Sequence, residues 1–173
     1  LSRRQRQMCI RDSTSNTNTG GWANSYHRRT LLGNTGTPTS PPSNSLLAAM
    51  PADLRAVMKA VTKYSDNTGG GSNTASYVTS TTDYLPLLAE FEIHGARSYA
   101  NSAEQNYQKQ YAYYQAGNSK VHYKHNATGT AAYAWCRSVT ATNTNYFCRV
   151  NTDGYPGGSY ANTSWAVAPG FAA

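Results

Sequence analysis

The sequence predicts an α+β domain, in which short helices pack against a small antiparallel sheet. The densest run of β-forming residues spans 131–150, where two halves flank a polar tip at 140–144. Helical spacing of apolar residues recurs only in short stretches, and loops rich in Gly, Pro, Ser and Asn separate them. The length of 173 residues suits one domain of ordinary size.

The 131–150 run is predicted to form a β-hairpin with Trp135 as its anchor in the core. Cys136 and Cys148 are equally distant from Thr142, so they should face each other across the hairpin. Directly opposed strand positions place their Cβ atoms roughly 4.5–5.5 Å apart, which is slightly wide for a disulfide. A disulfide and a pair of half-buried free thiols both fit the sequence, and the width favours the thiols.

The other elements follow from periodicity and from turn residues. Helical spacing predicts a short helix over 22–32, one broken helix or two short ones over 45–60, and a helix over 102–114 whose tyrosines form a packing stripe. Alternation or β-forming residues predict strands over 61–64, 84–88, 120–125 and 164–171. Gly, Pro and Asn predict loops over 33–43, 65–76 and 155–163.

Two closely spaced carboxylates are the first candidates for acid or base chemistry. Glu90 and Glu92 precede Gly95, which is a typical helix C-cap. On a strand the two side chains would share a face and form a paired-carboxylate site, whereas on a helix they would not. We expect a solvated turn and no catalytic residue here.

No cofactor or metal site is expected elsewhere. Gly69-Gly70-Gly71 lacks the Lys-Ser/Thr sequence and the strand–helix context of a phosphate loop. His122 and His125 are three apart on a predicted strand, so they point to opposite faces and should not share a metal. Trp135, Arg137 and Trp165 are assigned to the architecture.

The N-terminal segment carries a large share of the formal net charge. Arg3–Asp12 resembles the in-frame translation of a sequencing adapter, so residues 1–13 are expected to be a disordered assembly scar. Residues 14–19 are a polar loop, and 20–173 form the single domain. Four arginines and one aspartate give the scar +3, which leaves +4 of the formal +7 for the rest.

Neither nucleic-acid binding nor membrane insertion is expected. After Arg28-Arg29 there is no basic cluster of the kind that a nucleic-acid footprint requires. No apolar stretch approaches the roughly 20 residues of a membrane-spanning helix.

A set of segments covers most of the chain after residue 19, and their order along the chain is more specific than any one of them: 20–28, 54–59, 83–95, 111–120, 135–138, 146–148, 153–154 and 167–171. Taken in this order, they resemble an uncharacterised domain family of gut Firmicutes and their phages. That family is more remotely similar to the C-type-lectin-like fold shared by formylglycine-generating-enzyme-like domains and phage variable receptor-binding proteins. The resemblance implies two or three helices around a small twisted antiparallel sheet with long loops, and termini brought together by the last strand.

The sequence departs from that family in a few places. Cys136 stands where the family has an acidic or apolar residue, and Val139 stands where it has Pro. Ala172-Ala173 replaces an ending that usually contains Cys. The family also has strands before Gly20, so the first strands are expected to be missing and one sheet edge unpaired.

We expect a non-catalytic recognition or structural module of a phage virion or of a bacterial cell surface. Its partner would be a cell-surface protein or a glycan, bound by polar loops on a rigid hairpin. The alternatives are an oxidative enzyme related to formylglycine generation, which would use Cys136 and Cys148, and a retroelement-diversified receptor-binding protein. The predicted ligand-binding residues are Asn143, Asn145, Tyr146, Tyr155, Tyr160 and Asn162.

Overall fold

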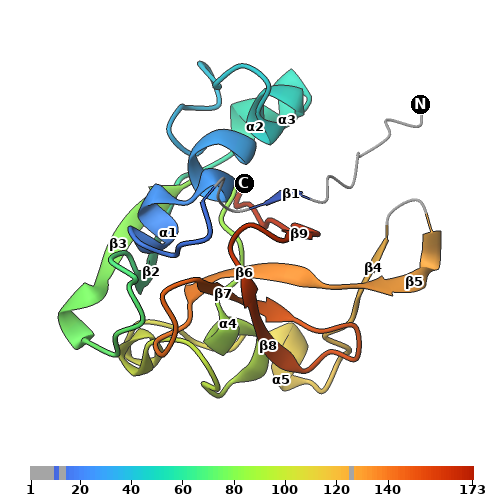
Figure 1. The fold of residues 1–173 in the computed structure, drawn as a ribbon. Coiled ribbons are helices and arrows are strands. Elements are labelled where there is room, and N and C mark those ends of the chain that lie inside the picture. Colours follow the sequence, from blue (N-terminus) through green and yellow to red (C-terminus); the bar gives the residue numbers. More distant parts are fainter. Residues whose placement is uncertain (1–9, 12–14, 125–126) are drawn as a thin grey trace.

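The computed structural model describes residues 10–11, 15–124 and 127–173. As predicted, it is an α+β fold in which few short helices accompany small antiparallel sheets (Figure 1). Within the described residues the largest sheet has three strands, β6 (Ala134–Val139), β7 (Tyr146–Val150) and β8 (Pro156–Tyr160), in the order β6-β7-β8.

Three further sheets have two strands each. They pair β2 (Val61–Asp66) with β3 (Val78–Asp83), β4 (His122–Lys124) with β5 (Ala127–Ala132), and β1 (Ile10–Arg11) with β9 (Ser164–Trp165). The strand β1 lies within the segment expected to be an adapter-derived scar. The rest of residues 1–13 lies outside the described residues, and the origin of the segment stays a prediction.

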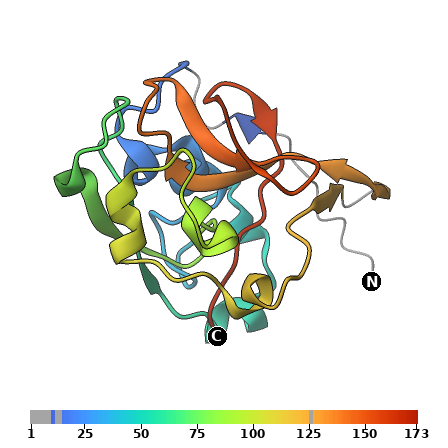
Figure 2. The same ribbon diagram turned by 90° about the horizontal axis from the view of Figure 1, so that it is seen from below.

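The helices are short and are held by tertiary contacts. They are α1 (Gly21–Asn24), a π-helix (His27–Leu31), α2 (Leu46–Ala49), α3 (Ala52–Val57), α4 (Glu90–His94), α5 (Ala112–Gln115) and the 3₁₀ helices η2 (Ala75–Tyr77) and η3 (Ser102–Asn106). α4, η3 and α5 gather on one side of the molecule, at the bottom of Figure 1 and toward the viewer in Figure 2.

The β6–β7 hairpin is the structural centre, as the sequence predicts. Every residue of β6 is buried, and Trp135 is only 3% exposed. Val139 pairs with Phe147 and Trp135 pairs with Arg149, and the register shifts between the two pairs. The main core gathers around this hairpin and consists of Trp22, Leu32, Leu47, Met58, Leu85, Leu87, Trp135, Val139, Phe147 and Ala161.

A buried polar cluster joins α1 to the β2–β3 hairpin. Trp22 donates its indole N–H to Asp83 Oδ2 at 2.9 Å, and Arg28 Nε donates to Asp83 Oδ1 at 2.7 Å. Asp83 is fully buried, so these donors replace the water that its carboxylate loses. The contact fixes the short helical segment 22–32 beside β3 although α1 alone is too short to be stable.

Several predicted boundaries are wrong. The segment 84–88 is no strand; the strand lies just before it at Val78–Asp83, and Leu85 and Leu87 are core residues in an irregular segment. The predicted loop 155–163 contains β8, and the predicted closing strand 164–171 is reduced to Ser164–Trp165. β8 pairs with the neighbouring strand β7, and β9 pairs with β1, so pairing with residues outside each segment, which the local pattern does not show, determined these boundaries.

The predicted helix over 102–114 is also wrong. η3 covers Ser102–Asn106, an irregular stretch follows, and α5 begins only at Ala112. Buried contacts of the stretch 107–111 replace helical hydrogen bonds: Gln108 Nε2 donates to Tyr64 O at 2.8 Å, and the Tyr111 N–H donates to Glu92 O at 2.9 Å. Two predictions hold well, since 45–60 forms two short helices and 61–64 lies within β2.

Candidate functional site

An open cavity of about 400 Å³ lies between β2, α4, β6 and the irregular stretch after η3. This volume is within the usual range for small-molecule sites, roughly 300–1,000 Å³. Its lining is polar and aromatic and comprises Thr62, Lys63, Tyr64, Glu92, Tyr107, Gln108, Lys109, Gln110, Tyr111 and Arg137.

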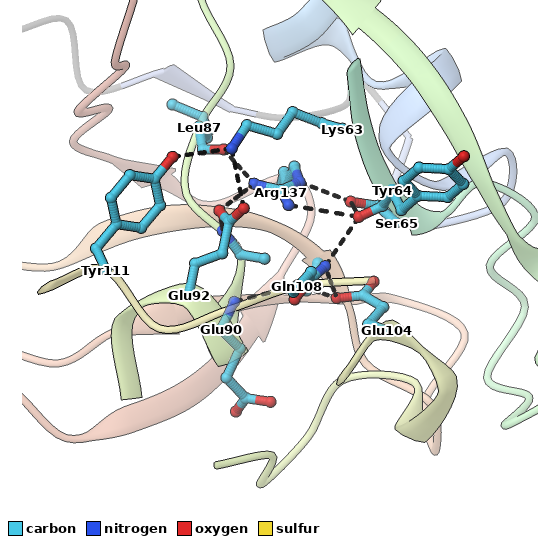
Figure 3. A network of polar contacts seen from close by, with 12 residues as sticks. Lys63, Tyr64, Ser65, Leu87, Glu90, Glu92, Glu104, Gln108, Tyr111 and Arg137 are labelled. Atoms are coloured by element: carbon cyan, nitrogen blue, oxygen red, sulfur yellow. Dashed lines mark hydrogen bonds and ion pairs between the residues drawn. The ribbon is translucent and has the colours of Figure 1, made fainter. Parts of the chain in front are cut away.

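The guanidinium of Arg137 forms the floor of this cavity (Figure 3). The residue is fully buried, and it donates to Ser65 Oγ at 2.8 Å, to Leu87 O at 2.8 Å and to Glu92 Oε2. Burial alone would lower the pKa of the guanidinium, but the charge and hydrogen bond of Glu92, together with Glu104 and Tyr111, outweigh burial and raise it. Arg137 is therefore a fixed charge that joins β2, α4 and β6, in agreement with its predicted architectural role.

Glu92 is the anion of the floor. It accepts from Arg137, from Lys63 Nζ at 3.0 Å and from the Ala89 N–H at 3.0 Å at the start of α4. Burial would raise the pKa of its carboxyl, but the charges of Arg137 and Lys63 and the hydrogen bonds outweigh it and lower the pKa. Glu92 is therefore ionised and only 4% exposed, so the prediction of a solvated turn is wrong.

Glu90 points to a different part of the fold. It is fully buried, and its carboxylate accepts from the N–H groups of Ser98, Tyr99 and Ala100 at 2.8–3.1 Å. Because the segment is a helix, Glu90 and Glu92 lie on different faces, and each carboxylate holds its own loop or side-chain partners. The two residues do not form a paired acid/base site.

A third buried carboxyl stands behind the cavity wall. Glu104 accepts from Ser138 Oγ at 2.6 Å, from the Asp66 N–H at 2.9 Å and from Gln108 Nε2 at 3.1 Å. Complete burial raises the pKa of its carboxyl, and these donors and Arg137 oppose the effect. Gln108 is itself buried, so this set of contacts fixes one wall of the cavity against β2 and β6.

Tyrosine side chains form the rim. The rings of Tyr64 and Tyr107 are stacked, with centroids 4.5 Å apart and planes 10° from parallel. Lys63 Nζ donates to the Tyr111 hydroxyl at 2.8 Å. Tyr107 is 55% exposed and Tyr111 is 41% exposed, so both offer aromatic surface to solvent. The sequence predicted only a packing role for these tyrosines and did not predict the cavity.

The predicted ligand-binding residues lie elsewhere. Tyr146 and Tyr160 pair across β7 and β8, with their rings edge to face at 4.5 Å. Tyr155 is 68% exposed but lies at the other end of the β7–β8 hairpin. The structure thus separates Tyr155 from the tyrosine pair.

The three asparagines of that prediction flank the tyrosine pair. Asn143 and Asn145 lie in the β6–β7 tip, where Asn143 O accepts from Asn18 Nδ2 at 2.7 Å. Asn145 O accepts from the Ala161 N–H at 2.8 Å, and Asn162 is exposed just beyond β8. Together with Tyr146 and Tyr160 they form the tip surface, whose role in binding stays a prediction.

Both thiols of the hairpin are free and buried. Cys136 and Cys148 belong to one apolar cluster with Ile93, Ala100 and Val150. Burial, together with the charge of Glu90, raises the pKa of both thiols well above the usual value. They are therefore fully buried protonated thiols rather than the half-buried ones expected.

The described residues contain no group of three or more His, Cys, Asp and Glu side chains that could hold a metal ion. His125, which was predicted to point to the other face of the strand from His122, lies outside the described residues. None of the helices in the described part has the length and apolar character that crossing a bilayer requires.

Fold and site together define an α+β domain that carries an open, tyrosine-rimmed polar cavity over a buried ionic network. The model of a family described as a domain of unknown function, DUF6273, matches residues 5–172, and the chain belongs to this family. No curated protein and no solved structure matches the chain.

Proposed function

We propose that this chain is a non-catalytic recognition or structural module of a phage virion or of a bacterial cell surface. Its partner in this proposal is a cell-surface protein or a glycan. The proposal includes a C-type-lectin-like arrangement of the domain and an origin among gut Firmicutes or their phages. Loops and cavities on a rigid framework are where binding usually resides.

The observation that carries the proposal is the contrast between the floor and the rim of the cavity. Lys63 and Arg137 both donate to Glu92, and their positive charges outweigh the effect of burial and keep Glu92 ionised. A general acid or base needs a pKa near the working pH, and the pKa of Glu92 is shifted in the opposite direction. The exposed lining residues are Thr62, Tyr107, Lys109 and Tyr111, whose side chains suit contact and hydrogen bonding.

The position of the thiols also favours recognition over the oxidative alternative. A reactive cysteine needs a lowered pKa and access to solvent. Cys136 and Cys148 have a raised pKa and are at most 1% exposed. The retroelement-diversified alternative predicts sequence variation confined to 140–163 among near-copies of the gene, which sequencing would detect.

The proposal is tested by incubating the fluorescently labelled chain with intact cells of gut Firmicutes and measuring bound protein after washing. We expect saturable binding that heat-unfolded protein lacks, and no soluble fragment released from the cells. Mass spectrometry of the supernatant supplies the second measurement. Time-dependent release of cleaved or oxidised products, abolished by Cys136→Ser, would show an enzyme instead.

A further inference from the structure

We infer that the cavity between β2, α4 and the 107–111 stretch binds a sugar that carries a carboxylate, with Lys63, Lys109 and Tyr111 toward the acid group and the tyrosine rings against the sugar ring. This inference rests on the proposed recognition function and names its ligand class and its site. It places binding at the cavity rather than at the tip surface.

The charge of the cavity lining selects an anion. Its lining contains three cations, Lys63, Lys109 and Arg137, and one carboxylate, Glu92, so two positive charges are in excess. Arg137 and Glu92 are bound to each other in the floor. Lys63 is held by Glu92 and Tyr111 with its side chain 16% exposed, and Lys109 is exposed, so the excess charge lies at the accessible part of the cavity.

Two polar groups in the cavity are already positioned for a carboxylate. Lys63 Nζ has three N–H donors, of which Glu92 Oε1 and the Tyr111 hydroxyl take two. Because the Tyr111 hydroxyl accepts from Lys63, its own O–H is available as a donor to the ligand. A carboxylate seated beside them would receive charge-assisted hydrogen bonds, which are about twice as strong as neutral ones.

The tyrosine rings account for the sugar part of the ligand. Tyr107 stacks on Tyr64 and keeps over half of its surface open, and Tyr111 is 41% exposed. Their flat apolar faces suit the C–H face of a pyranose, while the phenol hydroxyl of Tyr107 can bond its hydroxyl groups. An extended acidic peptide would need a long groove with free backbone partners, whereas the lining is a compact set from β2, α4, β6 and one short stretch.

Gln108 helps to hold the site and is not expected to bind ligand directly. Its Nε2 donates to Tyr64 O and to Glu104 Oε2, and its Oε1 is closed to solvent without a partner among the described residues. The residue is 6% exposed. Its bonds tie the backbone beside Tyr107 to the strand that carries Lys63 and Tyr64, so the rings and the ammonium group are placed before ligand arrives.

The test uses nuclear magnetic resonance of the full ¹⁵N-labelled chain titrated with pairs of defined probes. The acidic and neutral pairs are methyl glucuronide with methyl glucoside and methyl galacturonide with methyl galactoside, and N-acetylneuraminic acid is compared with methyl galactoside. Acetate and a glutamate-rich peptide test the anion and the peptide alone. We expect saturable shifts of the Lys63, Tyr107 and Tyr111 amides with at least one acidic sugar, and at least tenfold weaker binding of its neutral counterpart.

Variants connect the shifts to the cavity. Lys109→Gln should weaken binding about fivefold, as loss of about 1 kcal/mol implies, and Tyr107→Ala should weaken it further. Lys124→Gln removes an exposed lysine that does not line the cavity and should bind like wild type. Thermal melts check that each variant is folded. If Tyr107→Ala proves unfolded, the affinity of Lys109→Gln and the salt dependence of wild-type binding still test whether the sugar binds in the cavity.

The inference is overturned if no acidic sugar binds, if acetate or the peptide binds as tightly as the sugars, or if the shifts appear at Tyr146 and Tyr160 instead. The same variants in the cell-binding assay separate this failure from failure of the proposed function. Cell binding that persists in Tyr107→Ala and Lys109→Gln would keep the recognition function and reject this site. Absence of cell binding by wild type, or chemical conversion of a bound sugar, would reject the function itself.

Discussion

Replacement of Arg137 by Met should destabilise the fold by about 3–5 kcal/mol. The side chain is fully buried and supplies donors to Glu92, Ser65 and Leu87. Methionine has similar length and no donors, so the substitution leaves a buried carboxylate with Lys63 and one backbone N–H. Removing one partner of a buried ion pair typically costs about 3–5 kcal/mol, because the charge of the other partner is no longer fully compensated.

The assay is urea unfolding followed by tryptophan fluorescence and circular dichroism. Urea is preferred because guanidinium chloride would screen the charges under test. Arg29→Met is the matched control: this arginine is exposed, its side chain donates to Asn24 Oδ1 at 3.3 Å, and its loss should cost under about 0.5 kcal/mol.

A double-mutant cycle separates the ion pair from the packing of the side chain. Arg137→Met combined with Glu92→Met removes both charges, so the double variant should be more stable than the sum of the single effects predicts. We expect a coupling energy within about 0.5–3 kcal/mol. A loss below about 1 kcal/mol in Arg137→Met, or strict additivity in the cycle, would refute the view that this pair holds β2, α4 and β6 together.

Three further predictions concern the core and its titrating groups. Trp135→Ala should cost roughly 3–5 kcal/mol, as large-to-small aromatic changes in cores do, and wild-type unfolding curves would contradict its core role. Burial and the charge of Lys120 lower the pKa of His94 from 6.5 to about 4, so its neutral form stabilises the fold above pH 6.5 and this contribution is lost as the pH falls through about 4. His94→Gln should therefore flatten the decline in unfolding free energy over that window, and an unchanged slope would contradict it. In a Cys9→Ser background, Cys136 and Cys148 should react with a thiol reagent only in denaturant; prompt labelling of the folded chain would contradict their burial.

The central hairpin could be predicted from the sequence because its information is local. Trp135, Val139 and Phe147 are β-forming residues on either side of a polar tip, and the structure pairs the two halves as expected. Cys136 and Cys148 both enter one buried cluster, whereas the register shifts between Trp135 and Val139, so their direct opposition stays a prediction. Local pattern and tertiary pairing agree in this hairpin, so the sequence alone predicts it.

The candidate site could not be predicted, because its residues come together only through long-range contacts. Glu92 is buried against Arg137, which is 45 residues later in the chain, and against Lys63, which is 29 residues earlier. Taken alone, Glu90 and Glu92 look like surface charge, since carboxylates are rarely buried without a partner. A single sequence gives the residue types and does not say which basic side chain meets which acid.

Gly157 shows the same limit in a strand. Glycine and tyrosine at 155–163 suggested a loop, yet Pro156–Tyr160 pairs fully with β7. A Cβ at Gly157 would lie 2.5 Å from Asn151 Oδ1, so the small residue makes room for a side chain of the preceding turn. Here glycine marks a close approach within a strand, which local composition cannot distinguish from a flexible loop.

Burying the ionic floor, formed by Lys63, Glu92 and Arg137, carries a desolvation penalty, and the segments that it holds in place explain why the fold contains it. Buried charges are seldom the most stabilising choice for a core, and apolar residues of the same size often serve stability as well. In this fold the ionic contact of Lys63 with Glu92 holds β2, and hydrogen bonds from Gln108 and from the Tyr111 N–H hold the backbone that carries the rim tyrosines. The stretch 107–111 is irregular between η3 and α5. Without the floor its tyrosines would have to be ordered when a ligand arrives, at about 0.5–1.5 kcal/mol for each immobilised side chain. The network therefore orders a binding surface before the ligand arrives. For this reason Arg137→Met should lower both the stability of the fold and the ligand affinity, whereas Lys109→Gln should lower the affinity alone.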